Sequence, residues 1–221
     1  MEKRLYFYSP GDNFYIAPLT LFVVAKHSVR ENGIHWLEPI WKAGPSGEDN
    51  GLSLFTSKLD AYIYAITLNE YDKGGWAAYS FSDISVTEMM IDVATIQDKY
   101  SIHINFGFAV DNEGKVLCPN EALITKGFVM SFPHEKGSSA LSPITLKFSK
   151  ELFKEINEYW VLHYRDYCKD LNTQNEISNS DMHSFASIAI SKMVITTENG
   201  RSDFDRVSRF SINKNEWIIS I

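Results

Sequence analysis

The stretch from residue 144 to residue 171 constrains the fold more than any other part of the sequence. It begins with alternating apolar residues, Ile144, Leu146 and Phe148, which predict a short strand with one buried face. From Lys150 onward apolar side chains recur every three or four residues, as in an amphipathic helix: Leu152, Ile156, Tyr159, Trp160, His163, Tyr164, Tyr167 and Leu171. Ser149 is a suitable N-cap for this helix. At 1.5 Å per residue the helix would be roughly 30 Å long, enough to form the centre of a small domain.

The segments around this helix predict a sheet. Residues 101–110 give the clearest strand, because Ile102, Ile104, Phe106 and Phe108 alternate with polar or small residues. Further strands are expected at residues 14–17, 52–57, 76–81, 123–132, 194–197, 207–212 and 216–221. Shorter helices are expected at residues 58–72, 87–100 and 180–192, and a polar loop at residues 172–180. Residues 19–25 are compatible with either a buried strand or the start of a short helix.

This order of elements predicts an α+β fold. A mainly antiparallel sheet would pack against the long central helix and two or three shorter helices. The chain has 221 residues, of which 44% are hydrophobic, enough for a sizeable core. We expect either one domain over residues 1–221 or two subdomains, 1–132 and 144–221, joined by the Gly- and Ser-rich residues 133–143.

The sequence predicts a cytoplasmic protein that does not enter a membrane. The apolar run at residues 5–8 is too short for the core of a signal peptide. The uncharged run at residues 13–25 is shorter than the roughly 20 residues that cross a bilayer. Two cysteines, Cys118 and Cys168, are too few for a disulfide scaffold and are expected to be reduced packing thiols.

Negative charge is concentrated in the middle third of the chain. Residues 48–121 contain 12 acidic residues and four lysines, a balance of −8, whereas the whole chain carries a net charge of −7. A field of this sign disfavours nucleic acid and attracts basic partners. A solubilising surface without a partner is the alternative interpretation.

No pattern in the sequence predicts catalysis, a metal or a cofactor. The six histidines include no pair at helical spacing, and phosphate-binding glycine loops and the serine-nucleophile elbow are missing. Cys118 would need a histidine as base, and His103 is the nearest partner along the predicted hairpin. The arginines at positions 201, 206 and 209 alternate with Asp203 and Asp205 and are expected to pair with these neighbours on a solvated strand.

One segment resembles a known class of proteins. The strand-to-helix segment with Phe55-Thr56-Ser57 and Ala61 is similar to one found in small accessory and immunity proteins of bacterial toxin and secretion loci. The resemblance covers about twenty residues and transfers no functional residue to this chain. It implies a bacterial protein that acts by binding.

Two functions are compatible with these observations. The first is a cytoplasmic binding protein that neutralises a basic protein partner, most simply an immunity protein inhibiting a bacterial toxin domain. Its contact residues would be Asp72, Asp83, Glu88 and Asp92 on an acidic surface. The second is an enzyme of unrecognised type that acts on a small substrate in a cleft between the subdomains. A deep polar pocket with histidine and a carboxylate would favour the enzyme, and a flat acidic face would favour the binder. The oligomeric state is left open.

Overall fold

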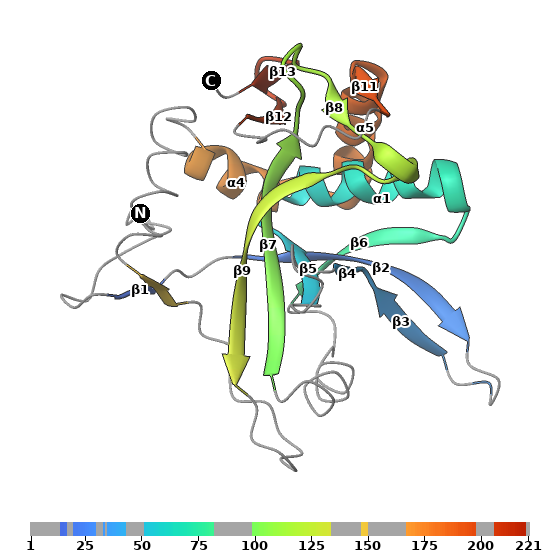
Figure 1. Ribbon diagram of the computed structural model, residues 1–221. Coiled ribbons are helices and arrows are strands. Elements are labelled where there is room, and N and C mark those ends of the chain that lie inside the picture. Colours follow the sequence, from blue (N-terminus) through green and yellow to red (C-terminus); the bar gives the residue numbers. More distant parts are fainter. Residues whose placement is uncertain are drawn as a thin grey trace.

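The computed structural model describes residues 14–16, 20–29, 33, 35–42, 51–81, 99–133, 147–149, 167–197 and 206–219. Within these residues the fold is α+β, with three α-helices and a largely antiparallel sheet (Figure 1). The helices are α1 (Lys58–Asp72), α4 (Tyr167–Glu176) and α5 (Asn179–Ser191), and a short 3-10 turn is η2 (Pro119–Glu121). The predicted fold class is therefore confirmed at this level.

The strands come from most of the described chain. In order they are β1 (Phe14–Ile16), β2 (Phe22–Val29), β3 (His35–Pro39), β4 (Trp41–Lys42), β5 (Gly51–Phe55), β6 (Trp76–Ser80), β7 (Lys99–Ala109), β8 (Val116–Leu117), β9 (Thr125–Pro133), β10 (Lys147–Ser149), β11 (Ile195–Thr196), β12 (Val207–Ser211) and β13 (Glu216–Ile219). Nine of them form one sheet in the order β13-β12-β7-β5-β2-β3, with β4 beside β5, β6 beside β2 and β9 beside β7. Only β5 and β7 run parallel within this sheet.

Strand β7 is the middle of the molecule, and its two faces differ in chemistry. The four residues predicted for one apolar face, Ile102, Ile104, Phe106 and Phe108, are all buried. The register shift between Asn105 and Phe108, however, places Phe108 on the face of Asn105, so the prediction of a single face is wrong for Phe108. The opposite face carries Ser101, His103 and Asn105, and these polar side chains are buried as well. A buried polar face costs free energy unless its groups are hydrogen-bonded, so this face is a place to look for a site.

Strand β7 bends where it passes from β5 to β12. Its register with β9 shifts between Asn105 and Phe108. A Cβ added at Gly107 would lie 2.6 Å from Cγ2 of Val207 and 2.9 Å from the Ser208 carbonyl oxygen. Glycine at position 107 therefore lets β12 approach β7 closely enough to pair with it.

Helix α1 packs against Phe22, Phe55 and Phe108 on the face of the sheet that also carries Asn105, and against α5 (Figure 1). The helix begins as expected after Ser57, whose hydroxyl accepts a hydrogen bond from the Asp60 backbone N–H at 3.1 Å and so caps its N-terminus. Its expected end at residue 72 is also confirmed, with Lys73 in the left-handed conformation (φ 51°). The strand-to-helix segment that carries the resemblance is thus built as the sequence predicts.

The structure resolves one expectation that the sequence left open, contradicts parts of two others, and leaves most of the central helix undescribed. Residues 22–29 form a strand, which resolves the alternative left open for residues 19–25. The expected polar loop at residues 172–180 is wrong at its start, because α4 continues to Glu176. The expected helix at residues 87–100 falls mostly outside the described residues, and its last two residues belong to β7. The predicted central helix falls outside them up to residue 166 and stays a prediction there, and its last expected residues, 167–171, lie in α4.

Candidate functional site

Of the four predicted contact residues, the structure describes Asp72. This residue ends α1, is exposed, and accepts a hydrogen bond from Nε1 of Trp76 at 2.8 Å. Asp83, Glu88 and Asp92 lie outside the described residues. Whether the four carboxylates share one surface stays a prediction.

Asp72 belongs to a surface that we call the Tyr71 surface, formed by Glu70, Tyr71, Asp72 and Glu121. Tyr71 is 38% exposed, and the three acidic residues that we group with it are exposed as well. Burial of its inner part raises the pKa of the Tyr71 hydroxyl, and the Cys118 sulfur and the carboxylates of Glu70 and Glu121 raise it further. These carboxylates therefore lie close enough to Tyr71 to affect its ionisation, although Glu121 comes from η2, far along the chain.

Cys118 lies beneath this surface as a packing residue. It is 1% exposed, belongs to the core cluster and shares a hydrogen bond with Tyr71. Burial raises the pKa of its thiol. A nucleophilic cysteine needs a lowered pKa, so the environment of Cys118 favours a neutral thiol.

A second place of interest is the polar face of β7, where Lys42 reaches from β4. Nζ of Lys42 donates hydrogen bonds to Oδ1 of Asn105 at 3.1 Å and to Oγ1 of Thr125. Thr125 in turn donates to Oδ1 of Asn105 at 2.5 Å. Nζ also lies 5.9 Å from the centre of the Tyr64 ring, a contact that favours a cation. Three strands thus bring one lysine, one amide and one hydroxyl together.

The Asn105 amide is held in one orientation. Its nitrogen donates to the Leu54 carbonyl at 2.7 Å, to Oγ of Ser53 at 3.0 Å and to the His103 carbonyl at 3.2 Å. All these partners of the nitrogen are acceptors, so Oδ1 must be the atom that faces Lys42 and Thr125. The Asn105 side chain therefore presents a fixed hydrogen-bond acceptor to the ammonium group of Lys42.

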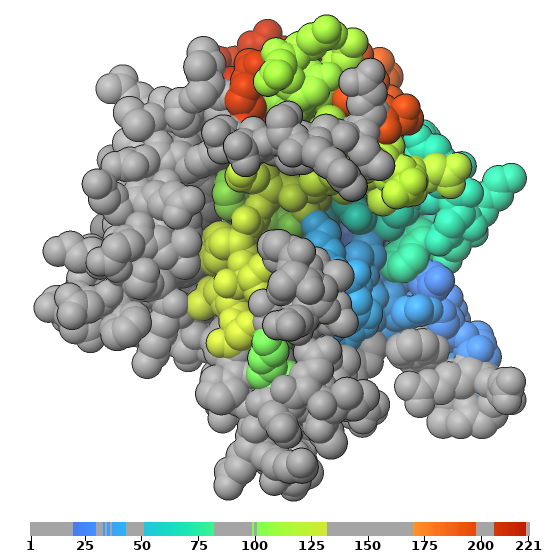
Figure 2. All heavy atoms as spheres, viewed as in Figure 1, coloured from blue at the N-terminus to red at the C-terminus, as the bar shows by residue number. Residues whose placement is uncertain are grey.

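A cavity of about 420 Å³ opens beside these residues. Its wall consists of Lys42, His103, Asn105, Pro119, Ala122, Leu123, Ile124, Thr125, Gly127, Phe128 and Val129. Figure 2 shows β9 in yellow-green and the blue residues of β3 and β4 on the face of the molecule turned to the viewer. We call this cavity the Lys42 pocket.

Burial lowers the pKa of Lys42 to about 8. Desolvation disfavours the ammonium form, and no carboxylate pairs with Lys42 in the described part of the chain. A lysine with this pKa is still mostly protonated at neutral pH. It therefore places a positive charge in a partly closed pocket.

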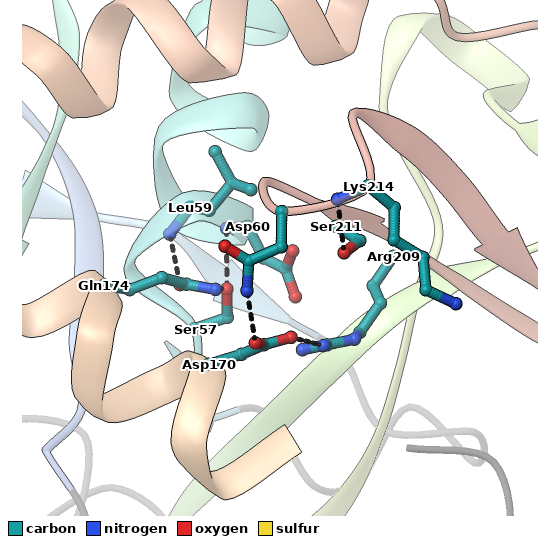
Figure 3. A network of polar contacts seen from close by, with 9 residues as sticks. Ser57, Leu59, Asp60, Asp170, Gln174, Arg209, Ser211 and Lys214 are labelled. Carbon is teal, nitrogen blue, oxygen red and sulfur yellow. Dashed lines mark hydrogen bonds and ion pairs between the residues drawn. The ribbon is translucent and has the colours of Figure 1, made fainter. Parts of the chain in front are cut away.

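A third polar cluster connects α1, α4 and β12 (Figure 3). Oε1 of Gln174 accepts from the Ser57 hydroxyl at 2.9 Å and from the Leu59 backbone N–H at 3.1 Å. Arg209 pairs with Asp170 from α4. Because Arg209 is buried and its partner is remote, the expectation that it pairs with a neighbour on a solvated strand is wrong. Arg206 donates to the Asn112 carbonyl at 3.0 Å, and residues 201–205 lie outside the described residues.

Asp60 lies in the same cluster and is buried. Its Oδ2 has no hydrogen-bond partner in the described part of the chain. Burial raises the pKa of Asp60 to about 7, while the charge of Arg209 and the hydrogen bond with Ser57 act in the opposite direction. The cluster is closed by packing, and we assign it a structural role.

The sequence did not show two of the pairings that the fold creates. His27 and His35 face each other across the hairpin of β2 and β3, with Nδ1 of His35 2.9 Å from Nε2 of His27. In the described residues no group of three or more metal-ligating side chains includes them. Lys42 and Thr125 are 83 residues apart, and no local pattern marks either of them.

A search for similar proteins found no matching family model, no matching curated protein and no matching solved structure. Among the described helices, none combines the length and the apolar character that crossing a membrane requires. The proposals about function therefore rest on the Tyr71 surface and the Lys42 pocket.

Proposed function

We propose that the protein is a cytoplasmic inhibitor that binds a basic protein partner, most simply the immunity protein of a bacterial toxin. The observation that carries this proposal is the Tyr71 surface, where an exposed tyrosine has the carboxylates of Glu70 and Glu121 close to its hydroxyl. The excess of acidic residues at positions 48–121 supports it. So does the resemblance of residues around Phe55-Thr56-Ser57 to proteins of bacterial toxin loci.

The two parts of this surface have different roles in the proposal. Exposed carboxylates act over several ångströms and speed up the encounter with a basic partner, an effect that salt screens. A tyrosine ring buried on binding provides much of the affinity, because aromatic anchors dominate interface energies. Tyr71 is held from below by Cys118, so little of its freedom would be lost on binding.

The test begins with capture of the partner from lysate of the native host, followed by association kinetics with the purified partner. The triple variant Glu70→Gln, Asp72→Asn, Glu121→Gln should associate about tenfold more slowly at low salt, with a flatter dependence on ionic strength. Tyr71→Ala should instead raise the dissociation rate about 30-fold, as expected for a hot-spot residue. Tyr71→Phe, which keeps the ring, should stay close to the parent.

The matched control is the double variant Glu176→Gln, Glu216→Gln. It removes exposed carboxylates from α4 and β13 and should leave the salt dependence nearly unchanged. If the triple variant and the control show the same slopes, the acidic surface has no part in binding. A captured partner that is acidic would contradict the proposal as a whole.

A further inference from the structure

We propose that the Lys42 pocket is a binding site for a small organic anion. Lys42 would hold its carboxylate or phosphate group, Thr125 and Asn105 would position the lysine, and the apolar wall at Leu123 and Phe128 would hold the uncharged body of the ligand. This site is separate in chemistry from the Tyr71 surface, which is acidic. It does not depend on the partner proposed above.

The charge of the pocket is the first reason. Both partners of the Lys42 ammonium group are neutral oxygens, from Asn105 and Thr125. The described wall contains Lys42 and His103 but no aspartate or glutamate. Desolvating an ammonium group without an anion is costly, and an anionic ligand would recover that cost. Besides these oxygens Nζ of Lys42 approaches the Tyr64 ring at 5.9 Å, and in the described part of the chain no third oxygen accepts a hydrogen bond from it, so the ammonium group can still donate to a ligand.

The second reason is that the polar groups are already in place. Asn105 is locked by three hydrogen bonds from its nitrogen, and its oxygen orients both Lys42 and Thr125. Sites whose donors are fixed in advance lose less free energy on binding than sites that must reorganise. Gly51 on β5 is the pairing partner of Lys42 on β4. A larger residue would not fit at position 51 without moving the strands, because its Cβ would lie 2.5 Å from the Ser101 carbonyl oxygen.

The size of the pocket indicates the class of ligand. Its volume of about 420 Å³ lies in the range of roughly 300–1,000 Å³ that small-molecule sites occupy. An inorganic anion alone would leave most of this space to water. The apolar residues Leu123, Phe128 and Val129 on the wall suit the hydrocarbon part of an organic acid.

The experiment uses the full chain and two ligand series in isothermal titration calorimetry at pH 7. Acetate, butyrate and hexanoate test the apolar wall, and affinity should rise up to about fourfold for each CH₂ that becomes buried. Benzoate and phenyl phosphate carry the same ring and distinguish a carboxylate site from a phosphate site. Inorganic phosphate tests the charge alone and should bind more weakly than phenyl phosphate.

Variants locate the binding. Lys42→Met should weaken binding of the tightest-binding probe by about tenfold or more, because it removes a charge-assisted hydrogen bond. Thr125→Val should weaken binding less, because Thr125 acts only by positioning Lys42. The control is Lys26→Met, which removes a lysine that pairs with Glu38 on β2 and β3, outside the pocket. This control should bind like the parent.

A second measurement uses only the parent protein, so its result does not depend on whether a variant folds. In protein labelled with ¹³C-lysine, the Lys42 resonance should titrate near pH 8, and a saturating probe should move its pKa upward. Binding should weaken above pH 8 for the same reason, since the neutral amine no longer attracts an anion. The inference is overturned if none of the probes binds at millimolar concentration, if Lys42→Met binds as the parent does, or if the probe leaves the titration of Lys42 unchanged.

Discussion

Two residues, the buried Asp60 and the half-buried Lys42, keep ionisable groups in places that disfavour their charged forms. Burial raises the pKa of Asp60 to about 7 and lowers that of Lys42 to about 8. Both shifts follow from loss of water around the charged form. The sequence gives no sign of either shift, because the groups that cover these residues come from distant strands and helices.

Replacing Asp60 should change how stability depends on pH. The folded-state pKa lies above the unfolded value of about 3.9, so the folded protein binds more protons between pH 4 and 7. The free energy of unfolding should therefore fall as pH rises through this window, by at most about 1.4 kcal/mol per unit from this group. In Asp60→Asn this contribution should vanish. Urea denaturation of parent and variant at pH 5, 6, 7 and 8 measures it, and parallel curves would refute the assignment.

At the scale of elements, α4 acts as a clamp on the start of α1. Leu171 and Gln174 are spaced three apart and both face inward, at 2% and 4% exposed. The sequence predicts a polar loop here because asparagine, threonine and glutamine dominate residues 172–175. The helix forms nevertheless, because Gln174 satisfies two groups at the N-terminus of α1, a tertiary contact that local propensity does not contain.

Gln174→Ala should therefore destabilise the protein although the residue belongs to a polar segment. It leaves the Ser57 hydroxyl and the Leu59 N–H without their acceptor in a buried place, which costs about 1–3 kcal/mol. The control Glu176→Gln changes an exposed residue on the same helix and should stay within about 0.5 kcal/mol. Urea denaturation measures both, and equal midpoints would show that the clamp contributes nothing.

At the scale of the whole molecule, β7 connects the N-terminal and C-terminal strands. It pairs with β5 and β9 and also with β12, which follows the 133–143 segment in sequence. The side chain of Phe108 on β7 packs against the Trp217 ring on β13, with ring centres 5.9 Å apart. Disrupting this contact should affect the described sheet as a unit.

Phe108→Ala should lower the free energy of unfolding by about 3–5 kcal/mol, as expected for a fully buried aromatic side chain. Because β7 joins both groups of strands, circular dichroism and tryptophan fluorescence should report the same transition in parent and variant. Two separated transitions, with the variant altering only one, would instead show that residues 1–132 and 144–221 unfold independently.

Local patterns were sufficient for much of the fold. Alternation identified β7, the helix expected at residues 58–72 is α1, and the strands expected at residues 207–212 and 216–221 are the hairpin of β12 and β13. The candidate sites were less accessible. Asp72 was found through charge, but Glu121, Lys42 and Thr125 acquire their meaning from neighbours that the fold supplies, as when Lys42 meets Asn105 across 63 residues.

The pairing of β12 with β7 also has a consequence for the order of folding during synthesis. Ser208 contacts Phe108 from 100 residues further along the chain. A contact of such long sequence separation forms slowly, and a ribosome must make β12 before it can form at all. Until then the end of β7 at Phe108 and Ala109 has an open edge, the kind of edge that pairs with other chains. The nascent protein is therefore most prone to aggregation late in its synthesis, when nearly all of its sheet except the C-terminal hairpin has been made.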